Sequence, residues 1–204
     1  MMKEFWESRY SEKDYAYGKE PNEFFKKEIS KIKAGKLLLP AEGEGRNAVF
    51  AASLGWDVLA VDQSYSGKEK ADSLSKEQCV KIEYLVADLN EYIPDEKNFD
   101  AVALIFAHFP IQLRAQIHSK LANALKPGGI LILEAFSKEH IRFNEKNPGV
   151  GGPKDESMLY SIEEMRNDFK NLNIEHLVIE TATINEGIYH CGDCSVLRMI
   201  ARRL

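Results

Sequence analysis

A short, glycine-containing segment between two apolar runs constrains this chain more than any other feature. The apolar run 37–40 leads into Ala41-Glu42-Gly43-Glu44-Gly45, and a helical pattern follows. A second apolar run, 58–61, ends at Asp62, nineteen residues after Gly43. This arrangement predicts a strand, a tight loop, a helix and a second strand, which is the plan of a βαβ nucleotide-binding unit. The acid after the second strand is placed to accept hydrogen bonds from both ribose hydroxyls.

The charge of this loop indicates which nucleotide it binds. Dinucleotide sites place a pyrophosphate on the helix N-terminus beside three glycines. Here Glu42 and Glu44 alternate with the small residues Ala41, Gly43 and Gly45. Two carboxylates would repel a pyrophosphate, but they would attract a ligand that carries an ammonium and a sulfonium. A turn that merely requires glycine is the alternative, and the acid at the right distance favours S-adenosylmethionine as the cofactor.

Length, charge and cysteine content narrow the class of protein. The 204 residues suit a single α/β domain over 1–204, and a net charge of −5 argues against a nucleic-acid partner. The longest apolar run, 101–107, is too short to span a bilayer, and the first residues lack an apolar signal region. Three cysteines provide no disulfide framework. We therefore expect a cytoplasmic protein without a membrane partner, and the sequence does not fix its oligomeric state.

The apolar pattern predicts an α/β fold. Strand-like runs alternate with helical patterns over 35–136, which predicts a doubly wound parallel sheet. A capping box at 161–164 predicts a helix to about residue 171, and the runs 174–183 and 196–201 flank a turn near Gly187. These runs predict an antiparallel hairpin at the sheet edge. We expect strands at 36–40, 57–61, 82–86, 100–106 and 129–135, and helices at about 45–54, 66–76 and 110–125.

Short motifs in a fixed order extend over nearly the whole chain. They are Trp6, Arg9-Tyr10, Tyr17-Gly18, Pro21-Asn22, the segments 41–50, 61–64, 87–89 and 125–129, and Glu186-Gly187-x-Tyr189-His190-x-Gly192. With them the chain resembles class I S-adenosylmethionine-dependent methyltransferases, and within these the tellurite-resistance methyltransferase group. The resemblance implies a Rossmann-like sheet that is mostly parallel, with an antiparallel C-terminal hairpin strand. It also implies methyl transfer to a small molecule such as a thiol or a chalcogen oxyanion.

The resemblance also implies roles around the cofactor. Most class I enzymes carry an acid where this chain has Leu39, so Glu42 is expected to hold the methionine ammonium instead. Asp88 would lie beside the adenine amine. Ala41 replaces the usual first glycine, so we expect its φ to be negative. The full set of expected cofactor-binding residues is Tyr17, Glu42, Gly43, Gly45, Asn47, Asp62, Gln63, Ser64, Asp88, Leu89 and Phe106.

An aromatic-rich arm covers residues 1–34. The first 25 residues hold seven of the twenty aromatics, and docking on the core is the expected role of Phe5, Phe24 and Phe25. Tyr17, beside Gly18, is the candidate for a lid residue whose ring shields the sulfonium from water. For Tyr17 the docking and lid interpretations both remain open.

Two histidines are candidates for the acceptor side. His190 matches the resemblance in the loop before the last strand, and His108 follows the strand at 100–106. An imidazole could orient an anion or accept a proton, whereas hydrogen bonding to backbone is the competing interpretation. Cys191 and Cys194 lie near His190, but two thiols and one imidazole fall short of a zinc site, so we expect no metal. The glycine-rich segment 137–160 is expected to form a substrate-side insertion.

The sequence leaves alternatives open for the type of methyl acceptor and for the activity itself. A soft or already ionised nucleophile needs no general base, and the sequence offers no unambiguous base, which favours a thiol or an oxyanion. Arg46, Arg142 and Lys154 could attract an anionic acceptor or could be solvated surface charges. Leu39 supports an inactive cofactor-binding protein that acts as a sensor or partner subunit. A nicotinamide-dependent oxidoreductase is opposed by the acidic loop and the hairpin.

Overall fold

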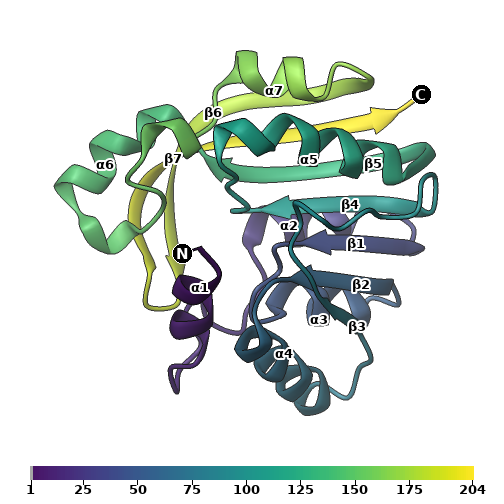
Figure 1. Ribbon diagram of the computed structural model, residues 1–204, viewed down its shortest axis with the longest axis horizontal. Coiled ribbons are helices and arrows are strands. Elements are labelled where there is room, and N and C mark those ends of the chain that lie inside the picture. Colours follow the sequence, from purple (N-terminus) through teal and green to yellow (C-terminus); the bar gives the residue numbers. More distant parts are fainter. Residues whose placement is uncertain (1) are drawn as a thin grey trace.

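The computed structural model describes residues 2–204 and builds them around one seven-stranded sheet (Figure 1). The strand order is β3-β2-β1-β4-β5-β7-β6, in which β1 to β5 are parallel and β7 is antiparallel to both of its neighbours. The predicted mixed α/β sheet with a C-terminal hairpin is thereby confirmed. The strands are β1 Lys36–Pro40, β2 Asp57–Asp62, β3 Glu83–Val86, β4 Phe99–Ile105, β5 Leu125–Phe136, β6 Leu172–Glu186 and β7 His190–Arg203.

Helices cover both faces of the sheet. Residues of α2, α3 and α4 pack in one hydrophobic cluster and residues of α5 and α7 in another. Because side chains alternate along a strand, Leu131 and Leu133 of β5 face α5 while Ile130 and Ile132 face α2. The helices are α1 Met2–Tyr10, α2 Glu23–Ile29, α3 Arg46–Ser53, α4 Tyr65–Glu77, α5 Ile111–Ala124, α6 Ile141–Lys146 and α7 Ile162–Asp168.

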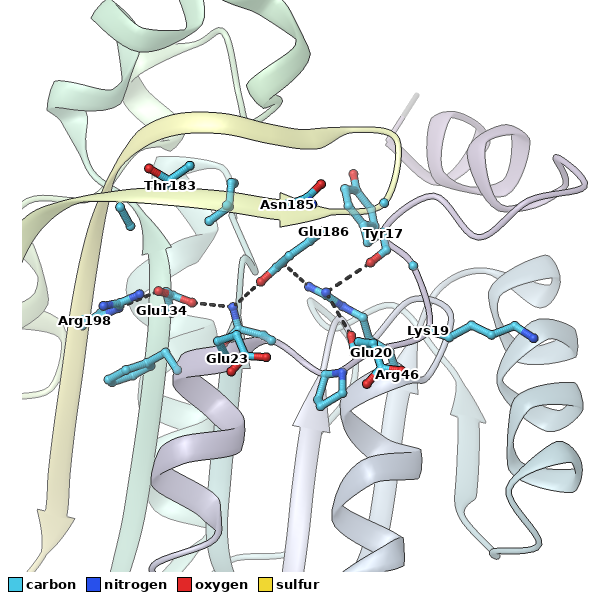
Figure 2. A pocket seen from close by; sticks show the side chains of 17 residues that line it. Tyr17, Lys19, Glu20, Glu23, Arg46, Glu134, Thr183, Asn185, Glu186 and Arg198 are labelled. Atoms are coloured by element: carbon cyan, nitrogen blue, oxygen red, sulfur yellow. Dashed lines mark hydrogen bonds and ion pairs between the residues drawn. The ribbon is translucent and has the colours of Figure 1, made fainter.

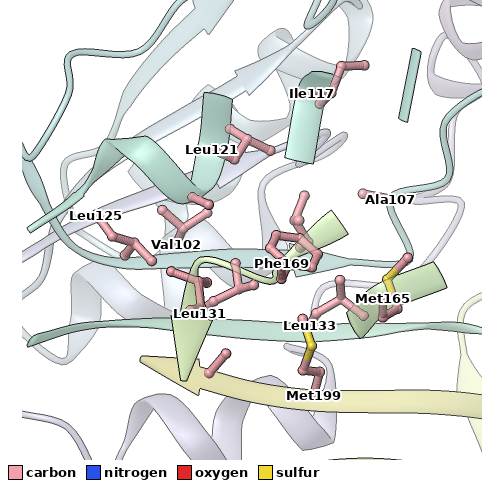
Figure 3. Packing of buried hydrophobic residues seen from close by; sticks show 14 of the residues in the cluster. Val102, Ala107, Ile117, Leu121, Leu125, Leu131, Leu133, Met165, Phe169 and Met199 are labelled. Atoms are coloured by element: carbon pink, nitrogen blue, oxygen red, sulfur yellow. The ribbon is translucent and has the colours of Figure 1, made fainter. Parts of the chain in front are cut away.

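The cluster under α5 and α7 is the larger of these two (Figure 3). Leu133 of β5, Leu121 of α5 and Phe169, which follows α7, are each at most 2% exposed. Burying a side chain of this size contributes roughly 1.5–3 kcal/mol. This core fixes β4 and β5, and with them the loops at their carboxyl ends.

Two of the four non-glycine residues with positive φ among residues 2–204 lie at carboxyl ends of strands, and the other two, Cys79 and Lys97, lie in turns elsewhere. Ala41, directly after β1, has φ 55°, and Phe106, directly after β4, has φ 51°. The expected negative φ of Ala41 is therefore wrong: the turn out of β1 requires a left-handed residue, and the small methyl group tolerates it. Strained non-glycine residues cluster at functional sites, and these two flank the edge where α/β folds bind ligands.

Several helices and strands begin or end at residues other than those predicted. β5 begins at Leu125 instead of residue 129, α7 ends at Asp168, and His190 opens β7 instead of lying in a loop. Phe5, expected to dock on the core, is 50% exposed. The segment 137–160 is not one loop but contains α6 and the short 3-10 helices η1 Lys138–His140, η2 Pro148–Val150 and η3 Glu156–Met158.

This segment has its own small core, in which Val150 and Leu159 pack with Phe136 at the end of β5. The expected insertion is thus attached beside the carboxyl edge of the sheet. Within residues 2–204, no helix combines the length and the apolar character that crossing a lipid bilayer requires.

Candidate active site

The loop between β1 and α3 requires glycine at two positions. Gly43 has φ 63° and Gly45 has φ 86°. A Cβ on Gly45 would lie 2.5 Å from the Cβ of Ala71 in α4, and a Cβ on Gly43 would lie 2.6 Å from the hydroxyl of Tyr10. The backbone of this loop is therefore packed as closely as a nucleotide cradle requires.

Asp62 stands where the sequence predicted the ribose acid. Its Oδ2 accepts the N–H of Gly43 at 3.0 Å, and its Oδ1 accepts the N–H of Ser64 at 3.0 Å. Burial raises the pKa of this carboxyl, and the backbone N–H bonds oppose that rise. Each oxygen keeps a further lone pair, so that the carboxylate suits two ribose hydroxyls.

Glu42 and Asn47 connect the loop to the arm. Oε1 of Glu42 accepts the N–H of Ala48 at 2.7 Å in the first turn of α3, and Oε2 lies 3.5 Å from Nδ2 of Asn47. Burial raises the pKa of Glu42 to about 7. Oδ1 of Asn47 accepts the N–H of Asn22 at 2.9 Å. Both side chains thus already have protein partners, and their contact with the cofactor stays a prediction.

The ends of β2 and β3 lie side by side, because the N–H of Ala87 donates to the carbonyl of Asp62 at 2.9 Å. Asp88 is exposed there and accepts only a local bond, from the N–H of Asn90 at 2.8 Å. Leu89 and Gln63 are half-buried. Asp88 thus lies at the carboxyl edge of the sheet, and its contact with an adenine stays a prediction.

The arm closes over this edge. Glu7 of α1 accepts four hydrogen bonds of 2.7–3.0 Å from the backbone and hydroxyl groups of residues 64–66 at the start of α4. Ser64 also caps α4, accepting the N–H of Gly67 at 3.0 Å. Tyr10 is buried next to the glycine loop, with Trp6 stacked on it at 5.4 Å between ring centroids. α1 therefore packs against the start of α4 and the glycine loop, beside the predicted cofactor site.

Aromatic rings from three other segments surround His190 at the start of β7. Its ring centroid lies 4.4 Å from that of Tyr17, 4.6 Å from Phe106 and 5.2 Å from Phe136. These segments are the arm, the end of β4 and the end of β5. Three residues proposed from the sequence are therefore brought together at the carboxyl edge of the sheet.

His190 is a buried imidazole beside one carboxylate. Its Nδ1 is fully buried and lies 3.7 Å from Oε2 of Glu186, an ion-pair distance that is too long for a hydrogen bond. Among residues 2–204, no group hydrogen-bonds its Nε2. Burial lowers the pKa of His190, although Glu186 opposes this. Burial therefore favours the neutral form of the ring, and Glu186 favours the charged form.

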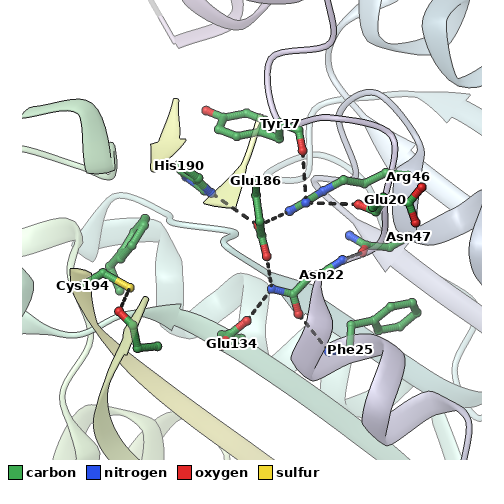
Figure 4. Close-up of polar contacts among 12 residues, drawn as sticks. Tyr17, Glu20, Asn22, Phe25, Arg46, Asn47, Glu134, Glu186, His190 and Cys194 are labelled. Carbon is green, nitrogen blue, oxygen red and sulfur yellow. Dashed lines mark hydrogen bonds and ion pairs between the residues drawn. The ribbon is translucent and has the colours of Figure 1, made fainter. Parts of the chain in front are cut away.

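Glu186 is a site residue to which the sequence assigned no role. Burial would raise its pKa, but His190 and Arg46 hold the pKa at about 2. Arg46 donates to its Oε2 at 2.6 Å, and Asn22 donates to its Oε1 at 3.0 Å (Figure 4). The sequence contained a signal for this role, because Glu186 and His190 are paired across the tight hairpin turn.

A cavity of about 380 Å³ lies on the other side of Glu186 (Figure 2). Asn22 donates to Glu134 at 2.5 Å, and Arg198 donates to the same carboxylate at 2.6 Å. The charged groups that Figure 2 joins by dashed lines thus pair with one another. They connect the arm to the hairpin. Each cation among the described lining residues has a carboxylate partner: Lys19 pairs with Glu77, Arg46 with Glu186 and Arg198 with Glu134.

His108 has a structural role instead of the proposed catalytic one. Its Nδ1 donates to the carbonyl of Met158 at 2.8 Å, and its Nε2 accepts the N–H of Phe136 at 3.2 Å. Burial lowers its pKa to about 3. Both ring nitrogens are therefore engaged with backbone, and neither is free for an acceptor.

The two thiols of β7 are separated. Cys194 is buried, with its Sγ donating to the carbonyl of Ala182 at 3.3 Å, whereas Cys191 is exposed. Positions three apart on a strand face opposite sides, so the two sulfurs do not form a pair.

Comparison with known proteins agrees with this geometry. Residues 40–129 match the methyltransferase domain family. The ubiquinone biosynthesis O-methyltransferase of Rickettsia canadensis is 30% identical over 111 residues, 54% of this chain and 45% of the relative. That of Rickettsia conorii is 28% identical over 114 residues, 56% of this chain and 39% of the relative. The chain thus spans less than half the length of these curated relatives.

Solved structures share the fold over most of the chain. One, from work on the conversion of a disulfide bond into a thioacetal group during echinomycin biosynthesis, has a TM-score of 0.78 at 20% identity and covers 100% of this chain and 92% of its own. TehB from Haemophilus influenzae has a TM-score of 0.73 at 17% identity, covering 90% of this chain and 63% of its own. At these identities the likeness shows the fold.

The glycine loop, the acid after β2 and the C-terminal hairpin together define a class I methyltransferase fold. With the match of residues 40–129 to the methyltransferase domain family, this fold makes the chain similar to the class I S-adenosylmethionine-dependent methyltransferases.

Proposed function

We propose that this chain transfers the methyl group of S-adenosylmethionine to the thiol of a small molecule. The observation that carries the proposal is the buried imidazole of His190, with Oε2 of Glu186 3.7 Å from its Nδ1 and, among residues 2–204, no hydrogen-bond partner on its Nε2. The sequence left His190 open as an imidazolium or as a base. Because burial lowers the pKa of His190, the proposal assigns it the role of the base.

In the reaction, the cofactor supplies an electrophilic methyl group on sulfur. Nε2 of His190 accepts the proton of the thiol, whose pKa in water is about 8.5. Glu186 is kept ionised by Arg46, so it favours the tautomer with a proton on Nδ1 and stabilises the imidazolium that forms. The rings of Tyr17 and Phe106 exclude water from the line between nucleophile and methyl group.

Sulfur is favoured over oxygen by two considerations. A thiol needs only a weak base, and a buried imidazole with a lowered pKa is a weak one. The neighbour from echinomycin biosynthesis is associated with sulfur chemistry, and TehB resembles the tellurite group identified from the sequence. The curated relatives are O-methyltransferases, so hydroxyl acceptors belong in the test.

The test is an acceptor panel with S-adenosylmethionine, read by mass spectrometry of the products. It contains aliphatic and aromatic thiols, selenite, tellurite and a catechol. We expect S-methyl products from thiols. Methylation of the catechol alone would overturn the thiol assignment. Binding of S-adenosylhomocysteine without any product would favour the inactive cofactor-binding protein.

A further inference from the structure

Arg9, at the end of α1, is held by aromatic rings instead of carboxylates. Its Cζ lies 4.0 Å from the ring centroid of Tyr189, 4.5 Å from Phe5 and 5.8 Å from Trp6. Among residues 2–204 it forms no ion pair, and its one hydrogen bond goes from Nη1 to the hydroxyl of Tyr17 at 3.1 Å. Ring faces fix the plane of a guanidinium and leave its N–H edge available.

Other arginines near the site differ in this respect. Arg46 pairs with Glu186 at 2.6 Å, and Arg198 pairs with Glu134 at 2.6 Å. Of the cations singled out from the sequence, Arg142 pairs with Glu139 at 3.0 Å and Lys154 is an exposed residue after η2. Arg9 is thus a half-buried cation whose remaining N–H groups have no partner among residues 2–204.

The position of Arg9 connects it to the acceptor side. The tyrosine that accepts its hydrogen bond, Tyr17, contacts His190 at 4.4 Å between ring centroids, with the rings tilted by 52°. The neighbouring Tyr10 faces the glycine loop, and consecutive helix residues point about 100° apart. Arg9 accordingly contacts Tyr189 at the hairpin turn, with one ring between its guanidinium and the proposed base.

We propose that Arg9 binds a carboxylate of the methyl acceptor, so that the substrate class is a small thiol that carries an anionic group. This inference rests on the proposed function. A guanidinium binds a carboxylate through two parallel N–H bonds, which would fix the distance from the anion to the thiol. The methionine carboxylate of the cofactor has the same chemistry, and the experiment separates the two sources.

The experiment titrates the protein, saturated with S-adenosylhomocysteine, with 4-mercaptobenzoate and with its methyl ester in a calorimeter. The two probes differ in one negative charge. We expect the parent to bind the acid about 10-fold or more tightly than the ester, and Arg9→Gln to bring this ratio close to one. Arg9→Lys should keep part of the preference. Arg142→Gln is the matched control, because it removes an exposed arginine of the same charge.

Three results would overturn the inference. In the first, the parent would bind the acid and the ester equally. In the second, Arg9→Gln would weaken the binding of both probes equally, as expected if Arg9 only attaches α1 to the hairpin. In the third, Arg9→Gln would weaken S-adenosylhomocysteine but not methylthioadenosine, which would assign the guanidinium to the cofactor carboxylate. A charge-dependent ratio in a protein that forms no methylated thiol would refute the proposed function and keep the anion site.

Discussion

The predicted cofactor half and the proposed acceptor half of this site are built in different ways. Around the glycine loop, Asp62 accepts backbone N–H bonds from residues 2 and 19 positions away. On the acceptor side, Glu186 is held by Asn22 and Arg46, which are 164 and 140 positions away, through side chains. The first half follows from a local pattern, whereas the second exists only once the arm, the sheet and the hairpin have come together.

Because the predicted cofactor half depends on the backbone of the glycine loop, we expect the largest effect from a substitution that disturbs this backbone. Gly45→Ala should destabilise the protein by several kcal/mol, because the new Cβ would lie 2.5 Å from that of Ala71 at a φ of 86°. Gly55→Ala is the matched control, since it has φ 88° with nothing within 4 Å. Gly55→Ala should lower the free energy of unfolding by only the roughly 1–2 kcal/mol that a left-handed backbone costs a residue with a Cβ. Urea unfolding measures both, and equal losses would show that loop packing is not tight.

The second-largest effect is expected at Asp62, the carboxylate predicted to bind the ribose of the cofactor. Asp62→Asn removes a charged acceptor for the ribose, so affinity for S-adenosylhomocysteine should fall by about 10- to 100-fold at an expected 1.5–3 kcal/mol per charged bond. Asp57→Asn, at the exposed other end of β2, is the control. Calorimetric titration measures both variants, and an unchanged dissociation constant in a folded Asp62→Asn protein would remove the ribose assignment.

Glu42 gives a smaller, pH-dependent effect at the boundary of the two halves. Burial raises its pKa to about 7 in the folded chain, above the value of about 4.5 in the unfolded chain. The folded state therefore binds more protons between these values, and stability is lost as pH rises from about 4.5 through 7. Glu42→Gln should remove this loss, on the order of 1–3 kcal/mol at pH 8. Urea unfolding at pH 5 and pH 8 tests it, and parallel curves for parent and variant would contradict the shift.

The same contrast explains how much could be predicted from the sequence. The loop and Asp62 were found because strand, turn and acid lie within one continuous segment. Ala41 was misjudged because the turn overrides the steric preference of a single residue. His108 was placed at the correct edge, but its two backbone partners belong to distant segments.

Long-range contacts account for what was missed. Tyr189 reaches the arm across 177 positions, through its hydroxyl to Glu12. The ring-held guanidinium of Arg9 depends on that same approach of the arm to the hairpin. Glu186 is an intermediate case, because a tight hairpin already implies that it faces His190.

The most direct test of a separate acceptor half is one pair of measurements on His190→Ala: thiol turnover and affinity for S-adenosylhomocysteine. Loss of a general base should lower kcat by about 10²- to 10⁴-fold. The residues predicted to bind the cofactor do not include His190, so the dissociation constant should stay within a few-fold of the parent. Unchanged turnover at saturating thiol, or a loss of cofactor affinity as large as the loss of turnover, would contradict the account.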